Sequence, residues 1–432
     1  MPPLQCSIFN CFGDMDGTQM KMLAERLFPI CRSITGQGVR ETLAILQEFA
    51  DLTIHEVSSG TQVFDWTVPQ EWNVSEAWIA NTRGERAIDF TTNNLHLLQY
   101  SQPFDGILKR SELERYLHTL PDQPTLIPYK TSYYRETWGF CLSEEQKATL
   151  VEDEYQVHIA SSLQPGVLNY GEILIPGTSA EEILISTHIC HPSLANDNLS
   201  GIVVALNVVQ YFTQNPGFYS IRVVLVPGTI GAITWLAINQ EKLELIRHGL
   251  VITGLGAGDT FHYKRSELET NVVNRVSELT LRENGESYII LPFSPYGYDE
   301  RQYNSPGIRL PVGCLMRTPH GSYPEYHTSA DNLSFLQADA LEKSSEMLIQ
   351  IIQNLSANRI YQNTSPFCEP QLGKRGLYTS DSEENLTFLW LLNQSDGSRS
   401  LLDIATRSGI TFSRIVAAAT RLLDAGLLKL VA

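Results

Sequence analysis

Residues 181–201 read EEILISTHICHPSLANDNLSG, an apolar run followed by a polar loop. The apolar run spans residues 182–187 and ends at His188, which is typical of a strand buried on both faces of a sheet. Ser200 and Gly201 then begin a stretch with helical character. A buried strand that leads through a polar loop into a helix predicts one unit of an α/β sheet, and ligands bind such sheets at the carboxyl ends of the strands.

The alternation of strands and helices continues on both sides of this segment. Strand-like runs EILIPG, IRVVLVPG and GLVIT occupy residues 172–177, 221–228 and 249–253. Helical patterns cover residues 17–50, where two helices are expected, and residues 201–212, 234–247 and 338–355. Apolar strands that alternate with helices predict an α/β fold, with a mixed sheet covered by helices on both faces.

Two regions depart from this alternation. Residues 60–167 consist of short, aromatic-rich runs between Gly, Pro, Asn and Asp, which is typical of β-strands and turns. The C-terminal region has the rhythm of a helix–turn–helix followed by a terminal strand, which predicts a winged helix. We therefore expect a main domain from residues 1–59 and 168–365, an inserted β-rich lid domain at 60–167, and a winged-helix domain at 370–432.

Composition and charge limit the partners. The 432 residues carry 48 acidic and 31 basic side chains, a net charge of −17, whereas nucleic-acid binding depends on the neutralisation of phosphates. The helix expected to read DNA offers only Arg414 and Arg421. We therefore expect no nucleic-acid partner and interpret the winged helix as a packing or dimer-forming module, which leaves a homo-oligomer open.

The sequence also predicts a cytoplasmic protein without a membrane segment. The longest apolar runs, such as residues 221–227, are far shorter than the roughly 20 residues that a transmembrane helix needs. The first 17 residues lack the basic and long apolar regions of a signal peptide, and we interpret them as a loose arm. Seven scattered cysteines without a small secreted framework indicate reduced thiols.

Four side chains are candidate metal ligands. His188 stands at the end of a strand and Asp197 follows in the loop, while Asp259 comes soon after the strand at 251–253. The motif YPEYHTSADN supplies His327. Imidazole and carboxylate groups at neighbouring strand ends are ligands that zinc prefers. Two other histidines near these motifs, His191 and His320, are interpreted as hydrogen-bonded structural residues.

These motifs resemble a known family. HICHPSLANDNLSG, a strand that ends in PGTIG, and YHTSADN are together similar to the co-catalytic zinc aminopeptidases of the M28 type. With GTQVFDWTVPQEWNV, SYYRETWGFCL, DERQYNSPG and LPVGCLMRTPHGSYPEYHTSADNL added, nearly the whole chain is identified as a member of the DUF4910 aminopeptidase-like family, often described as polysaccharide-biosynthesis proteins. The resemblance implies a zinc-aminopeptidase-like fold with a β insertion and a C-terminal winged helix.

The resemblance also implies roles for individual residues. His188 and His327 match the first and the last metal-binding histidines of these enzymes. Asp197 matches the carboxylate that bridges two metal ions, and Asp259 matches a further Asp ligand. Cys190 stands where aminopeptidases often have an Asp that orients the first histidine.

The main departure from the family pattern lies at Gly228. Zinc aminopeptidases have two adjacent glutamates at this strand end, a general base and a metal ligand, and the aminopeptidase-like family reads PETIG. This chain reads PGTIG, so neither carboxylate remains, and natural divergence or engineered inactivation would both leave this glycine. Loss of a general base typically costs about 10²–10⁴-fold in rate. Loss of the ligand weakens one metal position, so we expect zinc as one or two ions, with one favoured.

Other side chains are candidates to replace the base and to bind substrate. Glu325 is predicted as the substitute base, with Asp299 and Glu300 as alternatives. The residues predicted to contact substrate, from an aromatic wall of the insertion and from the DERQY segment, are Tyr134, Trp138, Arg301 and Tyr303, with Trp66, Trp72 and Tyr133 beside them. Each of these side chains has an alternative interpretation as a turn, salt-bridge or core residue.

The sequence leaves alternative functions open. The first is a metal-dependent amide hydrolase, of the aminopeptidase or deacylase type, that acts on a small amine-bearing metabolite or a short peptide and is weakened by Gly228. The alternative is a catalytically degenerate aminopeptidase-like protein that binds a ligand or scaffolds a complex. A third, a winged-helix regulator with a peptidase fold as its sensor, is opposed by the net charge of −17. The candidate ligands favour the hydrolase, and the missing glutamate favours the alternative.

Overall fold

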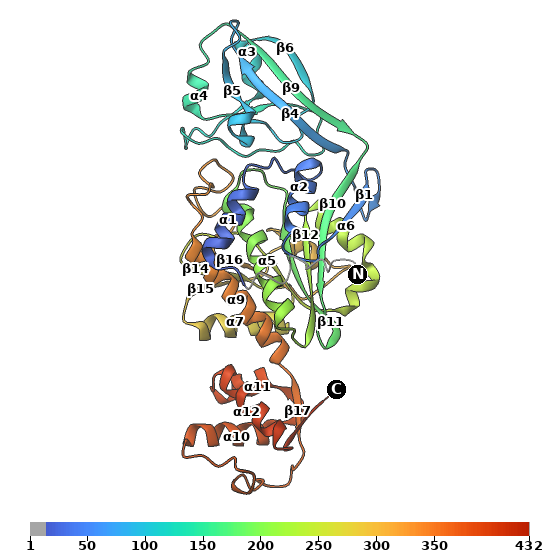
Figure 1. Ribbon diagram of the computed structural model, residues 1–432, viewed down its shortest axis with the longest axis vertical. Helices are drawn as coiled ribbons and strands as arrows, with labels where there is room; N and C mark the ends of the chain where they lie inside the picture. The colour runs from blue at the N-terminus through green and yellow to red at the C-terminus, as the bar shows by residue number, and fades with distance from the viewer. Residues whose placement is uncertain (1–13, 432) are drawn as a thin grey trace, which may run out of the picture.

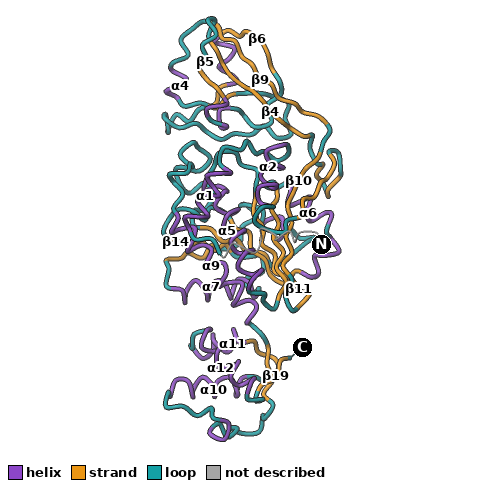
Figure 2. Tube along the Cα trace, viewed as in Figure 1, coloured by secondary structure: helices purple, strands orange, loops and turns teal. Residues whose placement is uncertain are grey.

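The computed structural model describes residues 14–431, which form three parts along one long axis (Figure 1). A β-rich part stands at one end, a large α/β part lies in the middle, and a small helical part lies at the other end. Strands dominate the first part, whereas helices and strands alternate in the middle part (Figure 2). The loose arm expected at the N-terminus falls mostly outside the described residues.

The middle part is built on an eight-stranded sheet in the order β1-β10-β12-β11-β13-β16-β14-β15. The central neighbours β12, β11, β13 and β16 run parallel, whereas β1–β10, β10–β12 and β14–β16 are antiparallel pairs. The expected mixed sheet is therefore confirmed. Its strands are β1 (Thr53–Ser58), β10 (Val167–Ile175), β11 (Ser179–His188), β12 (Tyr219–Val226), β13 (Ile246–Ile252), β14 (Thr260–Lys264), β15 (Ser287–Leu291) and β16 (Val312–Met316).

Helices cover both faces of this sheet. In β11, Ile183 and Ile185 pack into one apolar core and Leu184 packs into the other, because successive side chains of a strand point to opposite faces. This double burial explains why the run at 182–187 is apolar throughout. The first face carries α1 (Gly17–Leu27), α2 (Gln37–Leu46), α5 (Ser200–Gln214), α7 (Val272–Asn284) and α9 (Ala338–Ala357), and the second carries α6 (Ile230–Ile238) and α8 (Glu300–Tyr303).

The helix expected at 234–247 is interrupted. Helix α6 ends at Ile238, and the 3-10 helix η6 (Gln240–Leu245) follows before β13 begins. The backbone and side-chain N–H groups of Asn239 donate to the carbonyl of Trp235 at 3.0 and 2.9 Å. A side chain that bonds the last turn in this way competes with continued helix.

The β-rich part contains a four-stranded antiparallel sheet in the order β5-β4-β9-β6. Its buried Trp72 and Ile159 belong to the same apolar core as Leu184 and Trp235 of the middle part. This continuous core joins the insertion to the middle part of the protein. The elements are β2 (Gln62–Val63), β3 (Trp66–Thr67), β4 (Glu71–Ala80), β5 (Arg86–Asp89), η2 (Phe90–Thr92), η3 (Asn94–His96), β6 (Phe104–Lys109), α3 (Arg110–Leu113), η4 (Glu114–Tyr116), β7 (Leu117–His118), β8 (Phe140–Cys141), α4 (Glu144–Ala148) and β9 (Glu154–Gln164).

The C-terminal part is a winged helix, as expected. A three-stranded antiparallel sheet in the order β18-β17-β19 packs with three helices. Gly409, with φ of 72°, ends the second of these helices in the left-handed conformation that glycine tolerates. The elements are β17 (Ile360–Asn363), η7 (Gly373–Arg375), α10 (Ser382–Gln394), β18 (Asp396–Ser400), α11 (Leu401–Ser408), α12 (Phe412–Asp424) and β19 (Leu428–Leu430).

Residues 14–431 contain neither a membrane-spanning helix nor a disulfide. Within that range, no helix combines the length and the apolar composition that a membrane crossing requires. The cysteines found there are free thiols, at positions 31, 141, 190, 314 and 368. Burial raises the pKa of Cys141 and of Cys190 to about 12, so these thiols stay protonated at neutral pH.

The two environments in the sheet predict where truncation of a leucine destabilises the protein. Leu250 in β13 is 0% exposed, whereas Leu174 in β10 is 49% exposed. We expect Leu250→Ala to lower the free energy of unfolding by about 2–5 kcal/mol, because it leaves a cavity in the core. The matched variant Leu174→Ala should change it by less than about 0.5 kcal/mol in the same urea denaturation. Equal losses in both variants would contradict this description of the core.

Candidate functional site

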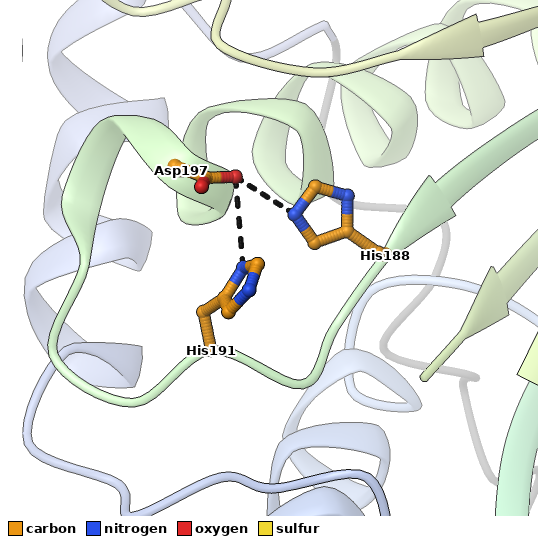
Figure 3. Close-up of side chains that lie close together, drawn as sticks. All are labelled: His188, His191 and Asp197. Carbon is orange, nitrogen blue, oxygen red and sulfur yellow. Dashed lines mark hydrogen bonds and ion pairs between the residues drawn. The ribbon is translucent and has the colours of Figure 1, made fainter. Parts of the chain in front are cut away.

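The candidate site lies where β11 ends and the chain turns towards α5. His188 is the last residue of β11, and a loop leads from it into the short helical turn η5 (Ala195–Leu199). Asp197 and Asn198 have non-helical backbone angles in this turn. The carboxylate of Asp197 therefore points back towards the end of the strand (Figure 3). Asp197 is 0% exposed.

Histidines converge on the carboxylate of Asp197 from two sides. Oδ1 of Asp197 lies 2.8 Å from Nε2 of His188 and 3.6 Å from Nδ1 of His191 (Figure 3). The other oxygen, Oδ2, lies 3.1 Å from Nε2 of His327. The structure thus brings together His188 and Asp197 with His327, which lies 130 residues from Asp197 in the sequence.

Burial and mutual contact set the charges in this group. Burial acts to raise the pKa of the Asp197 carboxyl, but contacts with the histidines outweigh it and hold this pKa well below its ordinary value. Burial lowers the pKa of His191 and of His327, although Asp197 opposes the change. Asp and His side chains bind a metal ion as an ionised carboxylate and a neutral imidazole, so the directions of these pKa shifts favour metal binding.

The group has the ligand types and the spacing of a metal site. The ligand atoms of His188, His191 and Asp197 lie within 4.8 Å of one another. Zinc bonds of about 2.0–2.2 Å in a tetrahedral arrangement place ligand atoms roughly 3.3 Å apart. The separations of 2.8 and 3.6 Å bracket that value, so these residues fit a zinc ion on the Oδ1 side. The described chain contains no second group of this kind.

Asp331 holds the turn that carries Asp197. Its carboxylate accepts the backbone N–H groups of Asn196 at 2.6 Å and of Asp197 at 2.9 Å, and its carbonyl accepts that of Ala195 at 2.9 Å. Burial is the main cause that raises the pKa of Asp331 to about 7. Because Asp331 follows His327 in the same segment, one loop provides a histidine of the group and supports its carboxylate.

A cavity of about 410 Å³ opens beside these histidines. Trp66, Tyr133 and Tyr134 line it from the β-rich part, and Gly228 lines it after the end of β12. A β-carbon at position 228 would lie 3.7 Å from Cβ of His188 and 3.3 Å from Sγ of Cys190. A longer side chain at position 228 would therefore enter the cavity beside the metal-ligand group.

Cys190 supports the end of β12. Its Sγ accepts the backbone N–H of Gly228 at 3.1 Å. The resemblance assigns an orienting Asp to position 190. In this protein Cys190 stands there and instead holds the backbone at Gly228, where the general base is missing. The imidazole of His188 instead stacks on the ring of Tyr298, with centroids 5.1 Å apart.

Asp299 is a carboxylate in the cavity wall next to position 228. It is 4% exposed, and its Oδ1 accepts the backbone N–H of Thr229 at 2.7 Å. Burial is the main cause that raises the pKa of Asp299 to about 7, while the hydrogen bond from Thr229 opposes the change. A carboxyl with this pKa can exchange a proton near neutral pH.

Two predicted acidic residues lie away from the cavity. Asp259 is exposed and is not part of the metal-ligand group, because the chain leaving β13 turns through Gly254 and Gly258, both with positive φ, before β14 begins. Glu325 is half-buried and does not line the cavity. Its carbonyl accepts the N–H of Thr328 at 3.1 Å, so it belongs to a turn.

Two residues predicted to bind substrate belong to the core. Trp138 is 8% exposed and stacks against both Phe104 and Tyr116, at centroid distances of 4.3 and 3.9 Å. Tyr303 is 0% exposed, and its hydroxyl lies 2.8 Å from Oγ of Ser186. Neither lines the cavity, whereas the predicted Tyr134 and Arg301 do.

The sequence interpretation missed two residues of the group. His191, interpreted as structural, is one of the three clustered side chains that could hold a metal ion, and Asp331 supports the loop of Asp197. Both lie within motifs that were recognised. The position of His191 three residues after a strand-end histidine was the available signal, since it keeps both imidazoles at the same sheet edge.

The fold is that of the zinc aminopeptidases. A solved zinc aminopeptidase from Bacillus subtilis is similar to this chain, with a TM-score of 0.55 and 11% identity, over 78% of this chain and 94% of that one. At this identity the likeness concerns the fold alone. It shows that this chain shares the architecture of that enzyme.

The chain belongs to the DUF4910 family, described as a domain of unknown function. The family profile matches residues 21–358, and a winged helix-turn-helix profile matches residues 359–430. A Clostridium acetobutylicum protein, named as a polysaccharide biosynthesis protein with an aminopeptidase-like domain, is 47% identical over 421 residues, covering 96% of this chain and 97% of that protein. A crystal structure described as a peptidase from the same organism matches with a TM-score of 0.92 at 47% identity and covers 96% of both chains.

The raised pKa of Asp299 predicts a pH-dependent loss of stability. A carboxyl whose pKa is higher in the folded chain stabilises the fold at low pH, and this contribution is lost as the pH rises through the folded value. For Asp299 the loss should extend from about pH 3.8 to about pH 7. Asp299→Asn removes the titration, so its free energy of unfolding relative to the parent protein should rise by at least about 1.4 kcal/mol between about pH 5 and pH 8.

This difference between variant and parent is measured by urea denaturation at both pH values with a chelator present. The lost hydrogen bond from Thr229 changes the free energy of unfolding of the variant by the same amount at both pH values. This change therefore cancels when the two pH values are compared. A difference between variant and parent that does not change with pH would contradict the raised pKa.

Proposed function

We propose that the protein is a metal-dependent amide hydrolase, of the aminopeptidase or deacylase type, that acts on a small amine-bearing metabolite or a short peptide. The observation that carries this proposal is the convergence of His188, His191 and His327 on the carboxylate of Asp197 in the wall of a cavity. The cavity volume of about 410 Å³ suits a small substrate. The names of the B. subtilis and C. acetobutylicum relatives support the same class of reaction.

In this proposal one zinc ion is held by Nε2 of His188, Nδ1 of His191 and Oδ1 of Asp197. Zinc at such a site supplies Lewis acidity, which polarises a carbonyl oxygen and lowers the pKa of water. One ion is favoured over two because the described residues offer one compact group of ligand atoms. His327, at 3.1 Å from Oδ2, then orients the carboxylate of Asp197.

Asp299 is the proton acceptor in this proposal. Its Oδ1 holds the amide of Thr229, so Oδ2 takes up the proton of the attacking water. Glu300 forms an ion pair with Lys264 at 2.7 Å and Glu325 does not line the cavity, so neither suits the role. A β-carbon at position 228 would lie 3.7 Å from Cβ of His188, and no carboxylate stands at this position, which is why we propose that the present protein is a slow enzyme.

We also propose a cytosolic protein whose winged helix does not bind nucleic acid. Arg414 and Arg421 of α12 form ion pairs with Glu383 and Glu384 of α10, so their charge is compensated inside the domain. The free cysteines among the described residues support a reducing compartment. A packing or dimer-forming role for this domain remains our proposal.

Metal analysis tests the ligand assignment. We expect about one zinc per chain by elemental analysis, removable by chelation, with zinc affinity measured by calorimetric titration. Asp197→Asn and His191→Ala should each lower that affinity at least about 10-fold, a loss found even for outer-shell partners of a metal. The matched control Asp259→Asn, an exposed carboxylate outside the group, should bind zinc like the parent. Equal losses in all three variants would remove the metal centre from the proposal.

Restoring a carboxylate at position 228 tests the missing base. Gly228 does not have a positive φ, and the contacts of a β-carbon there are tight only with Cys190, so a side chain can be placed. We expect Gly228→Glu to raise amide hydrolysis by at least about 10²-fold, the low end for general-base catalysis. Gly228→Gln has nearly the same volume without a basic carboxylate, so it should give no such gain.

The assay uses zinc-loaded protein and a panel of aminoacyl and N-acyl amides. If the parent already turns over at about 1–10³ s⁻¹, Gly228 is no defect, and Asp299→Asn should then abolish most of the activity. If no variant cleaves any amide although zinc binds, the degenerate ligand-binding alternative replaces the hydrolase.

A further inference from the structure

Arg301 lies in the wall of the cavity without a carboxylate partner. Its Nε is buried and makes no hydrogen bond, and its Nη2 reaches only Oγ1 of Thr229, at 3.4 Å. No ion pair joins its guanidinium to any Asp or Glu in residues 14–431. A buried guanidinium nitrogen without a hydrogen bond is costly, so the half-buried Arg301 suits a partner that the chain does not supply.

The buried Arg222 shows how this protein compensates a guanidinium that has no ligand to bind. Arg222 pairs with Glu172 on one side and with Glu182 on the other, inside the main sheet. Arg301 has no such arrangement, although Asp299 is only two positions away in the sequence. Asp299 instead directs Oδ1 to the amide of Thr229.

The lining of the cavity makes an anion the chemical complement of Arg301. Arg301 is the single Lys or Arg among the lining residues, and Asp299 is the single carboxylate. One guanidinium can compensate one negative charge, whereas a doubly charged phosphate would leave one charge uncompensated. A carboxylate matches both the charge and the planar, bidentate geometry of the guanidinium.

We propose that Arg301 binds a carboxylate of the substrate, which makes the substrate an amide with a free carboxylate, such as an N-acyl amino acid. This inference rests on the proposed function, because it assigns the cleaved bond to the His188–Asp197 group. Thr229 connects the two places: its hydroxyl contacts Arg301, and it follows Gly228, which lies beside His188. Arg301, His188 and His191 line the same cavity, so one small substrate can place a carboxylate at Arg301 and its amide beside the histidines.

Binding of matched ligand pairs tests this subsite without requiring turnover. The probes are N-acetyltyrosine, N-acetylalanine and N-benzoylglycine, each compared with its carboxamide by calorimetry. The protein is kept metal-free with a chelator, so that zinc cannot hold the carboxylate. We expect at least one acid to bind at least about tenfold more tightly than its amide, the gain from one charge-assisted hydrogen bond.

The variants assign that preference to Arg301. Arg301→Met should abolish it, and Arg301→Lys should retain part of it, because the charge remains while the bidentate geometry is lost. The matched control Arg309→Met removes an exposed arginine of the same segment and should leave the preference unchanged.

Several results would overturn the subsite. They are the absence of any acid-over-amide preference across the panel, a preference that survives in Arg301→Met, and tighter binding of inorganic phosphate than of every carboxylate. The proposed function can fail separately: if the acids are preferred through Arg301 but the zinc-loaded protein cleaves no amide, the carboxylate subsite stands and the hydrolase does not.

Discussion

The buried carboxylate of Asp197 is the group on which the site depends. A carboxylate with no exposure to water is stable only where opposite charge or hydrogen-bond donors surround it. Here His188 and His191 face one oxygen and His327 faces the other. The turn that carries Asp197 is itself held by Asp331, so the geometry is fixed before any ligand binds.

The parallel centre of the sheet explains why these groups meet. β11 and β12 are hydrogen-bonded neighbours that run in the same direction, so His188 and the Pro227–Gly228 segment emerge at the same edge. The β-rich insertion shares an apolar core with the second face of the sheet and therefore adds Trp66, Tyr133 and Tyr134 to the cavity at a fixed position. The site is small because two packed parts enclose it.

Much of this fold could be predicted from the sequence, because double burial leaves an unmistakable apolar run at 182–187 and helix periodicity marks α9. The meeting of His188, Asp197 and His327 was also predictable, through strand ends and family motifs. The environment of the aromatic residues could not be predicted. Trp138 lies in the core and Tyr134 in the cavity wall, and a sequence pattern does not distinguish these two places because both residues are aromatic. The position of Asp259 outside the group was not predictable either, because two glycines with positive φ set the direction of its loop and a local sequence pattern does not give that direction.

The central claim is that Asp197, His188 and His191 form a zinc site at the carboxyl end of the sheet. An anomalous-difference map from zinc-loaded crystals, recorded on both sides of the zinc absorption edge, tests it most directly. The account predicts one strong peak within about 2.0–2.2 Å of Nε2 of His188, Nδ1 of His191 and Oδ1 of Asp197. A peak elsewhere, or none at this position with zinc in excess, would contradict it.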